Sequence, residues 1–227
     1  MTAIVTSTFG DLLTDLAEKL GETTQNTSND RKRKLNNAYY FIANMRPWWF
    51  LEAEDTDTTT TATSYTLPSD FRIFRPKNPV KIGSDWRVLV PQEDQQLYDG
   101  SLPSATVQLP QVTGKKRAYL YGDKIYFIQD SMAASQTITY YYYKKITALD
   151  ETSDTPLIPV EFREMISLFA AGMYLKAQGG EESGEGDSYL ELYDVFLKSM
   201  EAEDNSRRKF GIKRRALDPE EALVFNQ

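Results

Sequence analysis

The chain has 227 residues, a net charge of -7 from 26 Lys and Arg against 33 Asp and Glu, and neither histidine nor cysteine. A sequence without these two residue types contains no Ser-His-Asp triad, no cysteine nucleophile, no disulfide and no zinc site of the usual Cys/His kind. The hydrophobic content of 41% is that of an ordinary folded protein. Any chemistry would have to use carboxylates, Lys, Arg, Tyr or Ser/Thr, and we expect no catalytic residues, no metal and no cofactor.

The sequence also limits the compartment and the partners. Its start has no basic region followed by an apolar core, so we expect no secretory signal. The longest nearly apolar run, residues 165–175, has 11 residues, whereas a membrane span needs about 20. We expect a soluble protein without a membrane partner. A pI near 4.8 argues against broad nucleic-acid binding.

The N-terminal segment predicts a pair of helices. Apolar residues from Phe9 to Leu20 recur at helical spacing and are followed by Gly21. A second helical stripe runs from Leu35 to Met45, and Pro47 ends it. The short polar connection at residues 22–26 favours an antiparallel pair.

Strand patterns take over after Asp55. Residues 56–66 contain seven threonines, and β-branched residues favour extended backbone. Short extended pieces follow at residues 65–71 and 86–90, with prolines and glycines between them. Gly122-Asp123 predicts a two-residue hairpin turn of a primed type within residues 118–128. Residues 137–146 predict a third long strand, beside this hairpin.

Helical spacing returns after Pro156, over residues 162–176 and again after Ser188. Neither helical pair has an apolar stripe wide enough to be stable alone, so we expect the two pairs to pack together. The predicted fold class is α+β. It comprises an N-terminal helical pair (1–55), an inserted antiparallel β domain (56–149), a C-terminal helical pair (150–205) and an extended C-terminal arm (206–227).

The arm has no sustained periodicity and carries six basic residues among residues 207–215, after an acidic block at 201–204. Such a chain end is loose unless a partner holds it, and segregated charge blocks suit docking between subunits. The predicted partner-binding residues of the arm are Arg207, Arg208, Lys209, Phe210, Ile212, Lys213, Arg214, Arg215, Leu223, Val224 and Phe225.

Two further groups are possible interface residues. Trp48 and Trp49 are adjacent, so one indole is expected to be buried while the other either anchors a partner or lies at the rim of the core. A basic cluster opens the second helix, where cations oppose the helix dipole. It is either an exposed charged turn or a contact for an acidic protein or DNA, and consists of Arg31, Lys32, Arg33 and Lys34.

Several patterns favour simple structural interpretations. The acidic residues at 52–57 have no spacing specific to metal binding or glycoside hydrolysis and are expected to be solvated loop charges. Residues 179–186 are glycine-rich but acidic, and they lack the Gly-Lys-Ser/Thr ending of a phosphate loop, so we expect a flexible interhelical loop. Tyr140 to Tyr143 alternate between two faces of a strand, which favours sheet packing over base stacking.

Taken in order, four motifs resemble the head-to-tail connector adaptor (head completion) proteins of tailed bacteriophages. They are Arg46-Pro-Trp-Trp49, Tyr65-Thr-Leu-Pro-Ser-Asp-Phe71, Tyr141-Tyr-Tyr-Lys-Lys145 and Asp154-Thr-Pro156. The resemblance implies a virion structural protein of the neck, made in the host cytoplasm. It would form a ring, usually of 12 subunits, between the portal protein and the tail or stopper protein.

The resemblance further implies that the C-terminal arm binds the portal, and that viral DNA passes through the ring without sequence-specific binding. An acidic surface fits that passage because it repels DNA. Three alternatives remain open. One is a tail-tube or gatekeeper ring of a short-tailed phage, another is a cell-wall hydrolase that uses carboxylates near residues 52–57, and the third is a free nucleic-acid-binding module.

Overall fold

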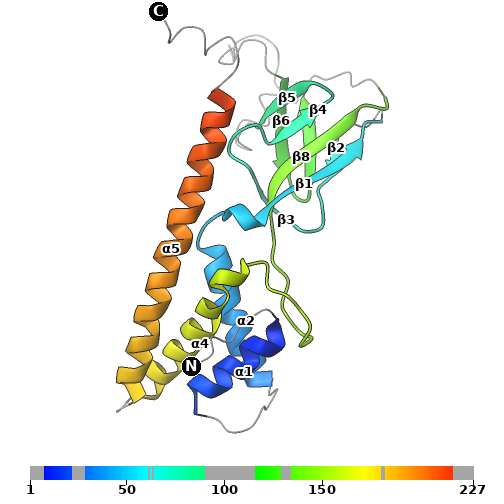
Figure 1. Ribbon diagram of the computed structural model, residues 1–227. Coiled ribbons are helices and arrows are strands. Elements are labelled where there is room, and N and C mark those ends of the chain that lie inside the picture. The colour runs from blue at the N-terminus through cyan, green and yellow to red at the C-terminus, as the bar shows by residue number, and fades with distance from the viewer. Residues whose placement is uncertain are drawn as a thin grey trace, which may run out of the picture. The chain divides into compact units, whose positions relative to one another are not determined.

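The computed structural model describes residues 8–21, 29–60, 62, 64–89, 116–128, 134–179 and 182–216, of which residues 116, 128 and 209–216 are described by their backbone alone. The chain divides into two compact units. Residues 1–50 and 146–227 form the helical unit, and residues 51–145 form the sheet unit. The predicted α+β fold, with a β domain inserted between N- and C-terminal helices, is confirmed (Figure 1).

Two helices form the N-terminal part of the helical unit. Helix α1 (Phe9–Lys19) begins with a capping box, in which Thr8 and Asp11 exchange hydrogen bonds of 2.8 and 3.3 Å through their backbone N–H groups. Its predicted apolar stripe is buried from Phe9 to Leu16, whereas Leu20 follows the helix and is partly exposed. Helix α2 (Asn29–Asn44) buries Leu35, Ala38, Tyr39 and Ile42 on one face, as the spacing predicts.

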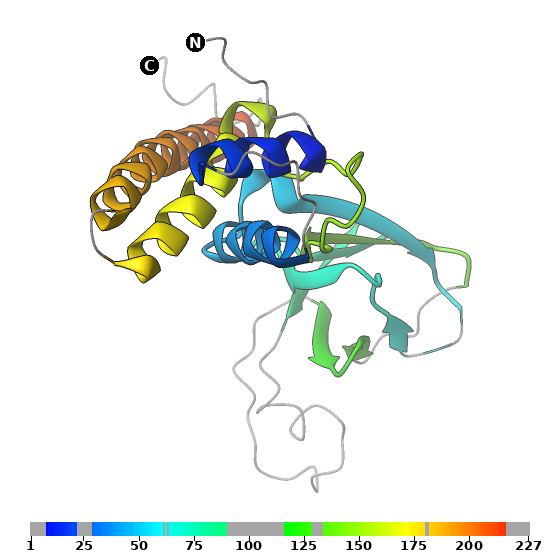
Figure 2. The same ribbon diagram turned by 90° about the horizontal axis from the view of Figure 1, so that it is seen from below.

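Helix α4 (Glu164–Gln178) is the centre of the helical unit, because it packs against α1, α2 and α5 (Glu182–Ala216). Figure 2 shows α4 lying between α5 and the N-terminal helices. The buried Ser167 hydroxyl of α4 donates to the Asp15 carboxylate of α1. Lys19 approaches the same carboxylate at 2.5 Å, so the buried charge of Asp15 is paired.

The connection from α4 to α5 differs from the prediction. Gly179 ends α4 with a positive φ of 74°, but α5 begins at Glu182 and not at Ser188. Gly186 lies inside α5, where it faces Gly172 of α4. A Cβ on Gly186 would lie 2.9 Å from the Gly172 carbonyl oxygen. The acidic glycine segment is therefore largely a helix–helix crossing rather than a flexible loop, since its glycines permit close approach of two backbones.

The end of α5 differs as well. The helix continues to Ala216, so the expectation of an extended chain from residue 206 was wrong for residues 206–216. Glu203 binds Arg207 at 2.5 Å and Asp204 binds Arg208 at 3.0 Å, both at i, i+4 spacing. Such pairs stabilise a helix, and they join the acidic block to the basic one within the same chain.

A return segment, residues 146–159, leads from the sheet unit back to the helices. Its backbone carbonyls at Asp154 and Thr152 accept hydrogen bonds of 2.8 and 2.9 Å from Phe9 and Gly10 of α1. Asn36 of α2 makes reciprocal 2.8 Å bonds with the backbone of Leu149. A 3-10 helix, η3 (Val160–Phe162), then precedes α4.

The sheet unit is one curled sheet of eight strands in the order β1-β8-β4-β5-β6-β7-β2, with β3 also paired to β8. The strands are β1 (Glu52–Thr58), β2 (Ser64–Thr66), β3 (Phe71–Phe74), β4 (Val80–Ile82), β5 (Asp85–Leu89), β6 (Lys116–Tyr121), β7 (Lys124–Ile128) and β8 (Thr137–Lys144). All pairs are antiparallel except β5 with β6, which is parallel.

The β6–β7 hairpin is confirmed, with Gly122 at φ 62° in its two-residue turn. The predicted position of β8 beside this hairpin was wrong, because β8 pairs with β1, β3 and β4 instead. Its tyrosines alternate as expected. Tyr140 and Tyr142 face the sheet core, and burial raises the pKa of both phenols. Tyr141 lies on the opposite face, against Trp86.

The glycine crossing generates a test. We expect Gly186→Ala to lower the free energy of unfolding by about 1–3 kcal/mol, because the new methyl group meets backbone atoms that cannot yield freely. Gly184 lies in the same helix, and a Cβ added there would have nothing within 4 Å. Gly184→Ala is therefore the matched control, and should raise stability by about 0.5–1 kcal/mol. Urea unfolding followed by circular dichroism measures both changes, and equal effects would contradict the close crossing.

Candidate interaction site around Asp204

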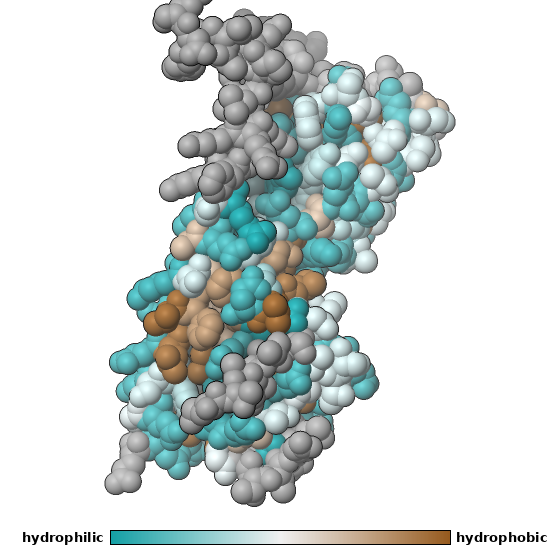
Figure 3. Space-filling model, viewed as in Figure 1, coloured by the Kyte–Doolittle hydropathy of each residue, from teal (hydrophilic) through white to brown (hydrophobic). Residues whose placement is uncertain are grey.

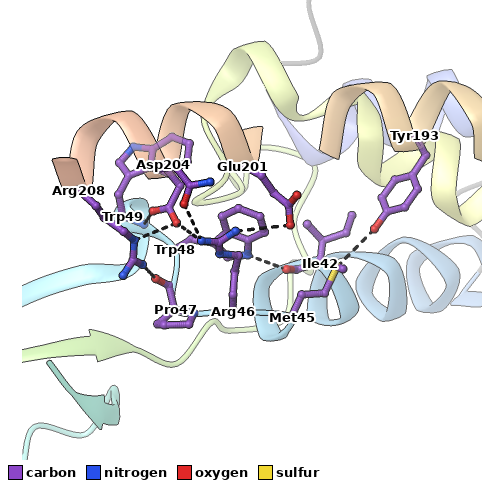
Figure 4. A network of polar contacts seen from close by, with 11 residues as sticks. Ile42, Met45, Arg46, Pro47, Trp48, Trp49, Tyr193, Glu201, Asp204 and Arg208 are labelled. Atoms are coloured by element: carbon purple, nitrogen blue, oxygen red, sulfur yellow. Dashed lines mark hydrogen bonds and ion pairs between the residues drawn. The ribbon is translucent and has the colours of Figure 1, made fainter. Parts of the chain in front are cut away.

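A polar network of the helical unit forms where the chain leaves α2 (Figure 4). Pro47 has no backbone N–H and cannot continue a helix, and the Trp48 N–H bonds back to the Arg46 carbonyl at 3.0 Å. This turn directs the two adjacent indoles differently. Trp48 is fully buried, and its indole N–H donates to the Ile42 carbonyl at 2.8 Å.

Asp204 of α5 is the centre of this network (Figure 4). Its side chain is fully buried and accepts from three donors: the Arg46 guanidinium at 2.8 Å, the Arg208 guanidinium at 3.0 Å and the Trp49 backbone N–H at 3.2 Å. Buried carboxylates are costly unless they are paired and hydrogen-bonded in this way. We call Asp204, Arg46, Trp48, Trp49 and Arg208 the Asp204 cluster.

Four further contacts strengthen the cluster. Arg208 also donates to the Pro47 carbonyl, and Glu201 approaches Arg46 at 3.4 Å. The guanidinium of Arg207 lies 5.0 Å from the centre of the Trp49 ring, at cation–π distance. Trp49 is half-buried and meets Phe162 edge to face. The cluster thus joins the distal part of α5 to the end of α2.

The structure therefore brings together four of the residues predicted for partner binding, namely Trp48, Trp49, Arg207 and Arg208. It gives each of them a contact within the helical unit. The arrangement presents no nucleophile beside a base. The arrangement holds one buried negative charge between cations. It thereby fixes the part of α5 from which the C-terminal basic segment begins.

The basic cluster at the start of α2 also has partners within the unit. Lys32 donates to the Asp150 carbonyl at 2.6 Å, and Lys34 binds Asp30 at 2.7 Å while it covers the Tyr174 ring at 3.5 Å. Arg33 binds the same Asp30 at 2.7 Å, and Arg31 is buried. The contact of Lys32 with the return segment is a structural role that its sequence position did not indicate.

The remaining predicted residues of the arm carry no side-chain description. Lys209, Phe210, Ile212, Lys213, Arg214 and Arg215 lie in the last turns of α5. Leu223, Val224 and Phe225 lie outside the described residues. Their role in binding a partner stays a prediction.

An exposed apolar surface lies beside the Asp204 cluster. Phe41 of α2, Met45 directly after α2 and Met173 of α4 are each about half exposed, at 50%, 46% and 51%. Phe41 stacks on Phe169, whose ring meets that of the buried Tyr193. Figure 3 shows hydrophobic residues gathered on the helical unit. Exposed apolar groups that adjoin one another are typical of protein interaction surfaces.

Sequence reasoning missed Glu201, Asp204 and the contact role of Arg46. The i, i+4 spacing of Asp204 and Arg208 was a signal for a continuing helix. The long-range pairing of Asp204 with Arg46 had no such signal, because it depends on how α5 packs.

The sequence comparison decides the family. The model of the SU10 adaptor protein family matches residues 7–215, which include both units and the whole Asp204 cluster. The chain belongs to the SU10 adaptor protein family. It is thus a phage adaptor protein and a component of the virion, as the resemblance implied. No curated protein is similar enough in sequence to count as a relative of this adaptor.

None of the adaptor's described helices is long and apolar enough to cross a membrane. In the same residues, no three acidic side chains gather in a way that could hold a metal ion.

The buried carboxylate can be tested directly. We expect Asp204→Asn to lower the free energy of unfolding by about 2–4 kcal/mol, because two guanidinium groups lose their shared counter-charge. Asp194 pairs with Lys198 at 3.0 Å on the exposed side of the same helix. The control Asp194→Asn should change stability by less than about 0.5 kcal/mol. Chemical denaturation measures both, and a neutral Asp204→Asn would show that the cluster is not stabilising.

Tyr193 predicts a pH dependence. Burial, together with the charges of Asp194 and Glu201, raises the pKa of Tyr193 to about 12, whereas an unfolded tyrosine titrates near 10. The neutral phenol therefore stabilises the fold fully below about pH 10, and this contribution is lost as the pH rises toward 12. Between pH 8 and pH 11, Tyr193→Phe should lose about 1.4 kcal/mol less stability than the parent. Urea titrations at pH 8, 10 and 11 measure the difference, and parallel losses would contradict it.

Proposed function

We propose that this adaptor forms a ring of about 12 subunits that docks on the portal protein and connects it to the tail or stopper protein at the virion neck. The ring forms part of the channel through which viral DNA passes. The proposal rests on the family membership of residues 7–215 together with the form of the C-terminal helix. Its role is structural, and no step of catalysis is assigned to it.

The carrying observation is the Asp204 cluster. It fixes α5 to the rest of the helical unit at residues 204–208, immediately before the basic segment at residues 209–215. The cations at 209–215 are thus held on a helix whose base is rigid, and the apolar residues Leu223, Val224 and Phe225 follow them in the sequence. A fixed base reduces the entropy that the segment loses when it binds a partner. This supports the segment as the portal-binding arm.

The charge distribution also supports a DNA conduit. By sequence, the sheet unit has 11 acidic and 11 basic residues, so the net charge of -7 resides in the helical unit. A negative surface lets DNA pass without binding.

Two other functions are less well supported. A tail-tube or gatekeeper ring shares the same general features, and would bind the tail rather than the portal. A carboxylate hydrolase is not favoured, since Glu52, Glu54, Asp55 and Asp57 lie along an exposed strand rather than in a cleft.

The arm is tested with portal rings of the same phage. A chain that ends at Arg208 keeps the Asp204 cluster but lacks residues 209–227, and should bind the rings at least tenfold more weakly than the full chain. The control carries residues 209–227 in scrambled order, with the same charge. Mass photometry measures binding. Absence of binding by the full chain would exclude portal docking, and equal binding by all three chains would exclude only the arm.

A further inference from the structure

The sheet unit carries two segments of opposite charge. Residues 52–70 contain five acidic residues and no basic one, and residues 71–84 contain four basic residues and no acidic one. Family membership does not explain this segregation, because it assigns no role to individual residues. Segregated charges on one unit suit contact between copies of that unit.

Strand β1, which carries four of these five acidic residues, forms an edge of the sheet. Strand β1 is the first strand in the sheet order and pairs with β8. Asp55 accepts from the backbone N–H of Thr56 at 2.8 Å, and Asp57 accepts from that of Thr58 at 2.7 Å. These backbone donors are already bonded, which disfavours the addition of another strand at this edge. Side chains are then the means of contact that the edge offers.

Glu52 and Glu54 project from the face of β1 opposite to that of Asp55 and Asp57, because side chains alternate along a strand. They lie opposite Tyr143 and Tyr141 of β8 in the strand register, and side chains directly opposite share a face of the sheet. Both glutamates are exposed.

A groove of about 750 Å³ lies on the opposite side of β8, between the β3–β4 connection and β5. Arg75, Lys77, Trp86 and Val88 are among its lining residues. Trp86 and Arg75 both contact Tyr141. The ring centres of Trp86 and Tyr141 are 5.4 Å apart, and the Arg75 guanidinium lies 5.2 Å from the centre of the Tyr141 ring. Arg75 and Trp86 therefore lie on the face of the sheet that carries Glu52 and Glu54. Leu89 and Leu120, which also line the groove, pack against the core on the other face.

Aromatic rings hold the cations of this region in place. The guanidinium of Arg75 lies over Tyr141, and the ammonium of Lys81 lies 5.7 Å from the centre of the Trp86 ring. Such cations lose little freedom when a carboxylate binds them. Trp86 is half-buried, and supplies the aromatic anchor that is enriched at protein interfaces.

We propose that the sheet units of neighbouring copies join head to tail, with Glu52 and Glu54 of one copy seated at the Arg75, Lys77 and Trp86 groove of the next. This inference rests on the proposed ring, and names the two surfaces that close it. The surfaces differ and lie on either side of β8. Contact between two different surfaces is heterologous, which is the kind of contact that generates rings.

A basic and aromatic groove is also compatible with nucleic acid. A second copy is favoured because the complementary charge is present on the same unit and the same face, while Asp85 lies within the groove lining and opposes phosphate. DNA binding is therefore treated as an outcome of the test.

Charge reversal tests the pairing. The acidic-side variant is Glu52→Lys with Glu54→Lys, and the groove variant is Arg75→Glu with Lys77→Glu. Each alone should weaken self-association at least tenfold in about 0.1 M salt, since like charges then meet. An equal mixture of the two should assemble again, and so should a chain that carries all four substitutions. The matched control reverses an exposed pair in the hairpin turn, Asp123→Lys with Lys124→Glu, and should assemble like the parent.

Cross-linking gives a second readout, because the chain contains no cysteine. A chain with Glu54→Cys mixed with a chain with Lys77→Cys should yield a disulfide-linked dimer under mild oxidation. Glu54→Cys mixed with Lys124→Cys should yield at least tenfold less. Circular dichroism and thermal melting confirm that each variant is folded, which is expected for exposed positions.

Assembly mass is measured by mass photometry, alone and on portal rings. Two outcomes would contradict the pairing of the two surfaces without contradicting the ring. In one, charge reversal leaves assembly unchanged; in the other, the groove variant loses only binding to a 20-base-pair DNA duplex. Failure of the parent chain to assemble under either condition would overturn the ring and the surfaces together. Rescue by the mixture and by the quadruple variant would establish the pairing.

Discussion

The close approach of α4 and α5 at Gly172 and Gly186 is the contact on which the rest of the helical unit depends. Side chains at this crossing would hold the two backbones apart, because a Cβ on either glycine meets atoms of the other helix within 3.0 Å. The 18 residues from Gly186 to Asp204 span about 27 Å of helix. A small change of angle at the crossing would therefore move Asp204 by several ångströms, away from Arg46 and Trp49. Two glycines thus determine whether a buried carboxylate far along the helix finds its partners.

Local patterns predicted most of the secondary structure. The apolar stripes of α1, α2 and α4 and the Gly122 turn follow from residue spacing and turn chemistry alone. They could be found because each depends on interactions within a few residues. The alternation of Tyr140 to Tyr143 belongs to the same class, since it follows from the geometry of any strand.

The errors arose where distant contacts override local preference. Glycine is a poor helix former, so the composition of residues 179–186 favours a loop. Only the packing of Gly186 on Gly172 reveals why this segment is largely helical. The basic segment after Asn205 has no apolar period, yet it is helical because its acidic neighbours pair with it. The partners of β8 depend on the whole sheet, and no local signal distinguishes β1 from β6 as its neighbour. The Asp204 cluster combines residues 155 or more positions apart, beyond the reach of any spacing rule.

The order of the elements also bears on how the chain folds during synthesis. The helices α1 and α2 emerge first, but α4, which covers them, follows more than 100 residues later. At typical rates of translation this interval is on the order of ten seconds. Throughout it the apolar faces of α1 and α2 lack their main cover, while the sheet unit, whose strands are contiguous in sequence, can already fold. The helical unit thus forms only after α4 has been synthesised, so a nascent chain that stops before residue 178 presents no finished helical unit to a growing virion.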